Sequence, residues 1–323
     1  MLDAEAVLRR ARRPLVLGMG GGGDVVGALA TAEFARIYGD AEPIVGGLTW
    51  ERRPIDPAPG PRRASEIEGA ELLARGVLLA GADTRVRGTD VYFAESRMAE
   101  FLGEPTVLVD IHAGPAGIAE GLGQATRTLD RDLVVFVDVG GDVLAEGDEP
   151  GLRSPLCDAV MLAAASFLGR AGCPVLAGIF GIGCDGELTT DEVLGRLAGV
   201  AKIGGLCGAR GLTEPVADRL EGAIRLVPTE ASAHAVSTFR GRSGLATIRD
   251  GLRTFELTSV AALTLYLDVE RTVQACGRLA RAVAPANSLE EANEALNRLG
   301  VRTELDLERQ AAADRGAPRP VPE

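Results

Sequence analysis

Four consecutive glycines and an aspartate follow the first apolar run of the sequence. The segment consists of Gly20, Gly21, Gly22, Gly23 and Asp24, between the apolar residues 14–17 and a helix-like stretch at 25–38. A loop that leads from a strand into a helix directs backbone N–H groups and a helix N-terminus at one small volume, where anions bind. We therefore assign these five residues to ligand binding. Asp24 either holds a metal or a ligand hydroxyl, or caps the helix.

The loop departs from two well-known phosphate-binding motifs. No Gly-Lys-Ser/Thr follows it, so the lysine of a P-loop is missing. Gly18, Gly20 and Gly23 match the G-x-G-x-x-G spacing of dinucleotide-binding folds, but the second expected strand ends in GGLTW, at 46–50, without the acidic residue that binds a ribose. Close approach of the backbone to a ligand explains the glycines equally well.

A pair of carboxylates flanks a glycine turn in the segment D-x-G-G-D. Asp138 and Asp142 stand on either side of Gly140-Gly141 and follow an apolar run. Hard cations such as Mg²⁺ take oxygen ligands from such sites, and one of two adjacent carboxyls can hold a raised pKa for acid–base work. We assign Asp138 and Asp142 as catalytic and metal-binding residues. The alternative is ordinary turn formation.

Asp110 and His112 form a D-x-H group after another expected strand. Alternation along an extended segment places both side chains on one side. This arrangement suits a metal or an acid–base pair, so Asp110 is a candidate metal ligand and His112 a candidate catalytic residue. The alternative is a carboxylate that orients a structural histidine.

A further loop combines glycine, cysteine and aspartate at residues 183–186. It resembles the GGDG loop that contacts nucleotide phosphates in diacylglycerol-kinase-like and NAD-kinase-like enzymes, with cysteine in place of the second glycine. Gly183, Asp185 and Gly186 are therefore assigned to ligand binding by analogy. Cys184 is either a nucleophile or a buried thiol.

Apolar runs that alternate with helical stretches must position these loops. The expected strands are 15–18, 43–47, 76–80, 106–110, 133–139 and 175–180, and the expected helices are 24–38, 66–74, 114–126, 155–170 and 190–203. This rhythm predicts an α/β fold with a doubly wound, mostly parallel sheet. Right-handed crossovers would bring the glycine-rich and acidic loops to one edge of that sheet.

The segment 51–63, ERRPIDPAPGPRR, should be an extended loop because proline fixes φ and lacks an N–H donor. It is either a solvated connection or an arm that brings arginines over the glycine loop. On the second interpretation, Arg52 or Arg53 would neutralise charge that develops on a phosphate.

After residue 205 the rhythm becomes irregular. Helical patterns cover 213–222, 228–239 and 288–299, with a hairpin or edge strands in 245–257 and an apolar segment at 260–267. We divide the chain into a Rossmann-like α/β domain at 1–205, a C-terminal α/β portion at 206–309 and a disordered tail at 310–323. We expect the C-terminal portion to continue the first domain, and a separate domain is the alternative.

Composition limits the classes of partner. A net charge of −12 argues against nucleic acid, whose phosphates require a basic surface. The longest apolar run, at 160–168, is too short to span a bilayer. Five cysteines without a CxxC pair, and a start without a secretory signal pattern, predict a soluble cytoplasmic protein. The expected partner is a small-molecule phosphate or nucleotide; homo-oligomer formation stays open.

Several of these segments together resemble one known family. The combination of GMGGGGDVVGALATAEFARIYG, GGLTWERRPIDPAPGPR, DVGGDVLAEGDEPGLRSPL and GIGCDGELT is similar to domain-of-unknown-function family 1152 of archaea and some bacteria, over roughly residues 10–300. The resemblance implies a Rossmann-like cytosolic protein and assigns no substrate or catalytic residue.

Three hypotheses about function follow. The leading one is an enzyme that acts on a phosphorylated or nucleotide-like small molecule with Mg²⁺. The second is an NAD(P)-dependent oxidoreductase, which the missing ribose-binding acid disfavours. The third is a non-catalytic small-molecule binding protein, because a fold does not determine a function.

Overall fold

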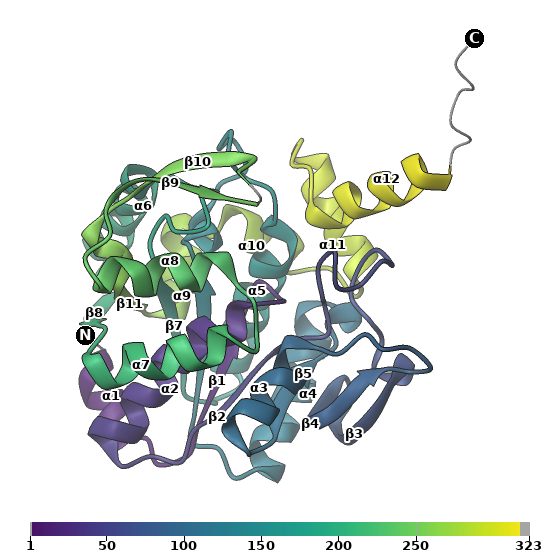
Figure 1. Ribbon diagram of the computed structural model, residues 1–323, viewed down its shortest axis with the longest axis horizontal. Coiled ribbons are helices and arrows are strands. Elements are labelled where there is room, and N and C mark those ends of the chain that lie inside the picture. The colour runs from purple at the N-terminus through teal and green to yellow at the C-terminus, as the bar shows by residue number, and fades with distance from the viewer. Residues whose placement is uncertain (1, 250, 317–323) are drawn as a thin grey trace.

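Short runs of branched apolar residues build one continuous sheet. A computed structural model describes residues 2–249 and 251–316 of the chain, and Figure 1 shows its arrangement. The sheet has the strand order β3-β4-β5-β2-β1-β6-β7-β11-β8. Its strands are β1 (Pro14–Gly18), β2 (Ile44–Leu48), β3 (Ile67–Ala74), β4 (Val77–Val86), β5 (Thr106–Val109), β6 (Leu133–Val139), β7 (Val175–Phe180), β8 (Leu206–Gly211) and β11 (Leu263–Leu267).

The five central strands β5, β2, β1, β6 and β7 are parallel, and the order reverses at β1. From β1 the chain proceeds to β2 on one side, whereas from β6 it proceeds to β7 on the other side. Right-handed crossovers therefore send the following helices to opposite faces and open a crevice between them at the carboxyl ends of β1 and β6. This is the Rossmann-like arrangement that the sequence predicts.

Helices cover both faces of the sheet. On one face lie α1 (Ala4–Arg10), α2 (Asp24–Gly39), α3 (Ala94–Leu102), α7 (Glu214–Ile224) and α8 (Glu230–Phe239), which share a core with Val16 of β1. On the other lie α4 (Gly114–Thr128), α5 (Pro155–Arg170), α6 (Thr190–Lys202), α9 (Val269–Cys276), α10 (Arg278–Val283), α11 (Leu289–Arg298) and the start of α12 (Glu304–Gly316), which share a core with Leu15 and Leu17. Alternate residues of β1 thus face the two layers.

Antiparallel strands close both edges of the parallel centre. The hairpin β3–β4 extends the sheet beyond β5, and β11 pairs antiparallel with both β7 and β8. Because β8 and β11 come from the C-terminal part of the chain, residues 206–309 share one sheet with residues 1–205. A second, two-stranded sheet consists of β9 (Gly244–Ile248) and β10 (Arg253–Leu257) and lies near α6 and α8 (Figure 1).

Two expectations about secondary structure were wrong. Residues 66–74 were expected to be a helix, yet 67–74 form β3. The segment is rich in Ala, Glu and Leu, which favour helices, and pairing with β4 overrides that preference. Residues 310–316 were expected to be disordered, yet they continue helix α12; the rest of that expected tail, 317–323, lies outside the described residues.

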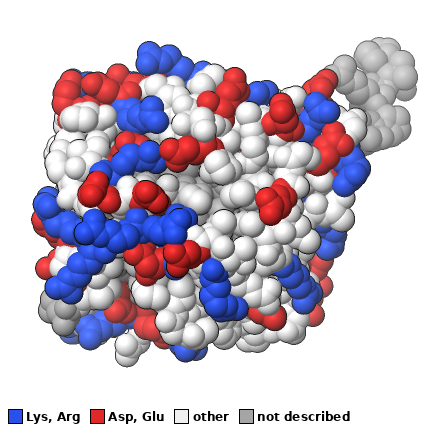
Figure 2. All heavy atoms as spheres, turned by 90° about the horizontal axis from the view of Figure 1, so that it is seen from below, with Lys and Arg blue, Asp and Glu red and all other residues white. Residues whose placement is uncertain are grey.

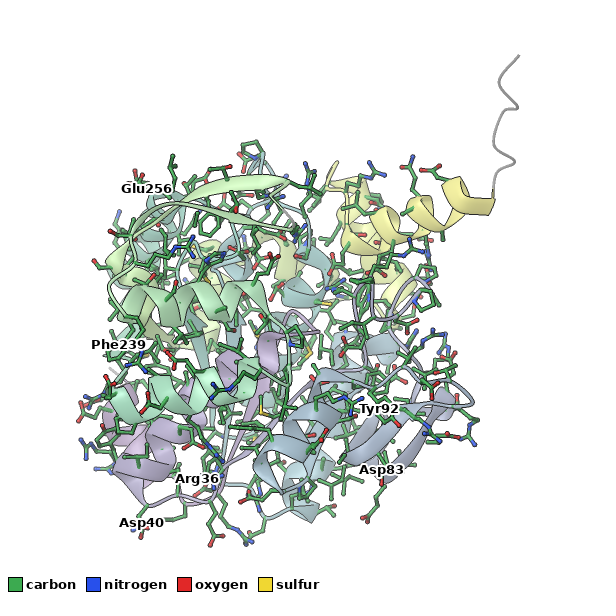
Figure 3. The ribbon with its side chains drawn as sticks, viewed as in Figure 1. Arg36, Asp40, Asp83, Tyr92, Phe239 and Glu256 are labelled. Atoms are coloured by element: carbon green, nitrogen blue, oxygen red, sulfur yellow. The ribbon has the colours of Figure 1, made fainter. Side chains whose placement is uncertain are left out.

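Charged side chains of both signs are intermingled on the face shown in Figure 2. Helix α2 extends from the glycine loop to the outer border of the molecule, where Figure 3 labels Arg36 and Asp40. Among the described residues no helix combines the length and the apolar character needed to cross a membrane.

Candidate functional site

The glycine loop links β1 to α2 at the point where the strand order reverses. Gly21 and Gly22 have φ angles of 81° and 54°, which side chains rarely tolerate. Asp24 is the first residue of α2, and its Oδ2 accepts a hydrogen bond of 2.9 Å from the Gly20 N–H group. The N-cap of the helix is Gly23, so the Asp24 carboxylate bonds back to the loop instead of capping the helix. Its Oδ1 has no hydrogen-bond partner among the described residues.

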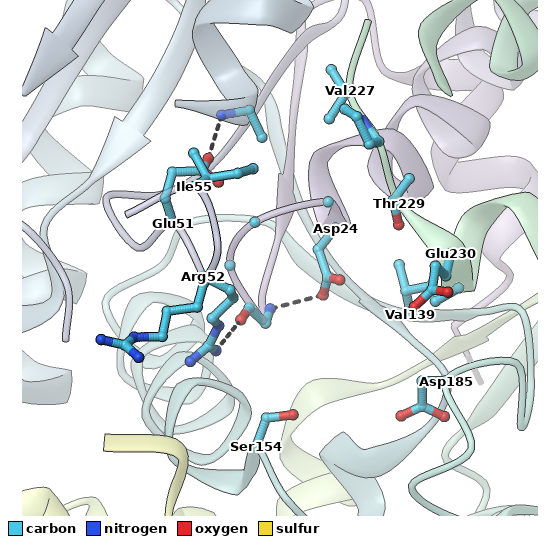
Figure 4. A pocket seen from close by; sticks show the side chains of 18 of the residues that line it. Asp24, Glu51, Arg52, Ile55, Val139, Ser154, Asp185, Val227, Thr229 and Glu230 are labelled. Atoms are coloured by element: carbon cyan, nitrogen blue, oxygen red, sulfur yellow. Dashed lines mark hydrogen bonds between the residues drawn. The ribbon is translucent and has the colours of Figure 1, made fainter. Parts of the chain in front are cut away.

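A cavity of about 670 Å³ opens over this loop. In Figure 4, Asp24 lies between Glu51 and Ile55 on one side and Val227 to Glu230 on the other, with Ser154 and Asp185 at the bottom. The first side is the loop after β2, and the second is the connection between α7 and α8. The cavity therefore lies where open α/β sheets bind their ligands.

Three carboxylates form a first acidic group beneath the cavity. Asp138 comes from the end of β6, Asp158 from the first turn of α5 and Asp24 from the start of α2; each offers an oxygen within 4.8 Å of the others. Asp138 and Asp158 are buried. Their Oδ2 and Oδ1 atoms, respectively, have no hydrogen-bond partner in the part of the chain that the structure describes. We call these three residues the first trio.

Asp142, Asp185 and Glu187 form a second trio, again with one oxygen each within 4.8 Å. Gly140 makes room for it, because a Cβ there would collide with the Asp185 carboxylate. Both carboxylate oxygens of Glu187 accept hydrogen bonds, whereas Asp138 and Asp158 of the first trio each have an oxygen that accepts none. The Glu187 Oε2 atom accepts from the N–H groups of Arg153 and Ser154, at 2.6 and 2.9 Å.

Burial of so many acids raises their pKa values. Burial, followed by the charge of Asp138, raises the pKa of Asp24 to about 8. Burial likewise raises the pKa of Asp138 to about 7. The pKa values of Asp142, Asp158 and Asp185 are well above the ordinary range because removal from solvent, which is partial for Asp185, and neighbouring carboxylates both disfavour the charged forms. Without a cation these carboxyls are therefore shifted toward their protonated forms.

Arginine side chains line the same cavity as most carboxylates of the two trios. Arg52 stacks over Trp50, 4.3 Å from its ring centre, and its Nη2 donates to the Gly20 carbonyl oxygen at 2.7 Å. Arg53, Arg97 and Arg249 also line the cavity. The proline-rich segment 51–63 thus places Arg52 at the glycine loop. This agrees with the interpretation of that segment as an arm that brings arginines over the glycine loop.

The structure brings most of the sequence-assigned residues together. Those that line the cavity are Gly20, Gly21, Gly22, Gly23, Asp24, Asp142 and Asp185. Asp138 joins them through the first trio, and Gly183 and Gly186 shape the loop that carries Asp185. Cys184 is buried, and burial holds the pKa of its thiol well above the ordinary value.

Asp110 and His112 do not reach the cavity. The Asp110 carboxylate accepts from the Ala64 N–H group at 2.8 Å and lies 2.6 Å from His112 Nδ1. Burial acts to raise the pKa of Asp110, but hydrogen bonds from His112 and Ala64 outweigh it and lower that pKa. Two strands separate β5 from the crevice beside β1, so this pair remains a sequence prediction without a place in the site.

Sequence analysis missed Asp158 and Glu187. Asp158 is the one acid within the apolar stretch 155–168, which is a usable signal because an apolar helix has little reason to carry a buried carboxylate. Glu187 belongs to the 183–189 loop, in which only Gly183, Asp185 and Gly186 were assigned to ligand binding. Glu51, which also lines the cavity, accepts a hydrogen bond from the Ala94 N–H group at the start of α3.

Comparisons with known proteins assign this fold to a family. No curated protein and no solved structure matches the chain. The family model described as "Protein of unknown function (DUF1152)" matches residues 15–312, a range that includes the glycine loop and both trios. The chain therefore belongs to the DUF1152 family.

Proposed function

We propose that the cavity binds a divalent cation such as Mg²⁺ together with a phosphorylated or nucleotide-like small molecule, and that the protein is an enzyme acting on that molecule. The observation that carries this proposal is the pair of buried, unpartnered oxygens on Asp138 and Asp158. A buried carboxylate without a hydrogen bond or counter-charge is costly. A cation in the first trio would compensate both of these oxygens at once, together with the carboxylate of Asp24.

The cavity walls favour a phosphate as the second component. Mg²⁺ is usually held by a few carboxylates and by phosphate oxygens of the substrate. The N-terminus of α2, the glycine loop and Arg52 all face the cavity beside the first trio, and each favours an anion. A nicotinamide dinucleotide is less suitable, because the sequence at the end of β2, GGLTW at 46–50, lacks the acidic residue that binds its ribose.

These groups could perform phosphoryl chemistry. A bound cation would polarise a phosphoryl oxygen, and Arg52 would stabilise the charge that develops on it. Asp142 and Asp185, whose pKa values are raised by burial and by their neighbours, could supply or accept a proton.

The cation is tested by titrating the metal-free protein with Mn²⁺ or Mg²⁺ in a calorimeter. We expect saturable binding by the wild type and at least about 100-fold weaker binding by Asp158→Asn, since removal of even an outer metal-site partner costs 10–100-fold. Asp83→Asn is the control, because Asp83 is exposed on the outside of the molecule (Figure 3). Absence of binding, or equal binding by Asp158→Asn, would refute the cation site.

The ligand is tested by thermal shift with nucleotides, sugar phosphates and NAD(P), each with and without Mg²⁺. A phosphate compound that raises Tm only with Mg²⁺ is the expected result. Turnover of that compound then separates an enzyme from a binding protein. If the compound binds unchanged over many hours, the protein is a binding protein.

A further inference from the structure

The two trios differ in whether the protein itself already supplies a positive partner for their carboxylates. This difference bears on how many metal ions the site can bind. In the first trio, Asp138 and Asp158 each keep an oxygen without a hydrogen bond. In the second trio, Glu187 already faces a cation of the protein itself. Its Oε1 accepts from Arg249 Nη2 at 2.7 Å, and from the Ser154 hydroxyl group, also at 2.7 Å.

Arg249 is held in this position by the hairpin of β9 and β10. Its backbone has a φ of 57°, which a residue with a side chain adopts only when its surroundings require it. Its N–H group donates to Glu230 Oε2 at 2.6 Å, at the start of α8. From β10, Arg253 Nη1 donates to the Gly186 carbonyl oxygen at 2.8 Å and fixes the hairpin against the loop that carries Asp185 and Glu187.

We infer that the Arg249 guanidinium is a built-in cation for the second trio, so that the protein binds one divalent ion per chain, at the first trio. Arginine stays charged at all physiological pH values. A divalent ion at Glu187 would lie within a few Å of the guanidinium, and repulsion between them would disfavour its entry, although solvent reaches the half-exposed Arg249 side chain and screens part of this repulsion. This inference rests on the proposed function, since it presumes that the first trio binds a cation.

The inference gives Arg249 a definite task beside the six carboxylates of the two trios. Two divalent ions would neutralise more charge than one ion and a guanidinium. The protein instead keeps one fixed positive charge that no chelator removes and no substrate carries away. A phosphate that enters would then be held between the bound ion and Arg249, since both face the same cavity.

The number of Mn²⁺ ions bound per chain tests this inference, counted by electron paramagnetic resonance of free Mn²⁺ during titration. We expect one ion for the wild type and two for Arg249→Gln, with the second site strengthened more than tenfold. Arg249→Lys keeps the charge and should return to one ion. Arg298→Gln, which removes the charge of an exposed arginine on α11 outside the cavity lining, should also bind one. The double variant Arg249→Gln with Asp185→Asn should lose the added ion.

The outcomes separate this inference from the proposed function. Two ions in the wild type would overturn the role of Arg249 and leave the cation site standing, and this measurement needs no variant to fold. One ion in a folded Arg249→Gln protein would overturn it as well. No ion in the wild type would refute the proposed function, and the inference with it.

Discussion

One carboxylate oxygen of Asp138 lies within 4.8 Å of one from Asp158, although the two residues belong to different elements, the end of β6 and the first turn of α5. Both side chains are buried, and each has an oxygen without a hydrogen-bond partner among the described residues. Such an arrangement destabilises the protein by itself. It is the pattern expected where function, and not stability, determines the residues.

The metal-free protein should lose stability as pH rises. Asp24 and Asp138 have folded pKa values of about 8 and about 7, above an ordinary value of 3.8. A carboxyl with a raised folded pKa stabilises the fold fully below its unfolded pKa, and this contribution disappears as pH rises through the folded pKa. We therefore expect Tm of the metal-free protein to fall between about pH 4 and pH 8.

Two measurements attribute that fall to the acidic site. Saturating Mg²⁺ should reduce it, because the ion binds the ionised carboxylates. Asp158→Asn should reduce it without metal, since one of the interacting charges is gone. A Tm that rises between about pH 4 and pH 8 in the metal-free wild type would contradict the prediction.

Gly23→Ala should damage ligand binding through a contact across the cavity. A Cβ on Gly23 would overlap the Thr229 side chain, with only 2.5 Å to its Oγ1, and would force the α7–α8 connection away from the glycine loop. The backbone φ of −70° suits alanine, so the effect comes from the contact alone. We expect weaker binding of the phosphate ligand and a lower Tm.

A second substitution checks this explanation of Gly23. Thr229 makes no side-chain cap bond to α8, so Gly23→Ala combined with Thr229→Gly should restore most of the lost binding. Gly195→Ala, in a helix where a Cβ meets nothing within 4 Å, should leave binding unchanged and raise stability slightly. Failure of the double variant to recover would point to another role for the loop.

Arg52 should contribute to binding of the phosphate by a direct contact, whereas its charge beside the first trio does not favour the cation. Its Nη2 already bonds to the Gly20 carbonyl oxygen, so the guanidinium is oriented before a ligand arrives. Loss of a charge-assisted hydrogen bond costs about 1.5–3 kcal/mol. Arg52→Gln should therefore weaken the phosphate ligand roughly 10- to 150-fold, measured by calorimetry with Mn²⁺ present. Arg298→Ala, an exposed arginine of α11, is the control.

The sequence predicted the edge of the sheet where the site lies better than it predicted the members of the site. Glycine loops after apolar runs identified the carboxyl ends of β1, β6 and β7, because strand, turn and helix signals are local. Asp158 is brought to the site by packing of α5 against the sheet; its place in an apolar stretch marks it as unusual but does not tell which loops it meets. The same limit explains Asp110 and His112, which follow a strand of the same sheet but lie two strands away from the crevice.

The C-terminal helix, which was expected to be a disordered tail from residue 310, takes part in the architecture of the site. Glu304, at its start, accepts hydrogen bonds of 2.9 Å from the N–H groups of both Leu156 and Cys157, in the first turn of α5. Its Oε1 also lies 3.7 Å from Arg52 Nη2. One buried carboxylate thus connects the helix that carries Asp158 to the arginine at the glycine loop.

Glu304→Ala should consequently weaken both stability and cation binding. It leaves two buried N–H groups without acceptors and removes a partner of Arg52, a loss of about 2–4 kcal/mol in the free energy of unfolding. Because Asp158 follows Cys157 directly, a shift of this turn should also reduce Mn²⁺ affinity. Glu304→Gln keeps one acceptor and should retain more of both properties, whereas Glu294→Ala, exposed on α11, should change neither. If Glu304→Ala unfolded at lower denaturant concentration yet bound Mn²⁺ like the wild type, the helix would stabilise the fold without positioning Asp158.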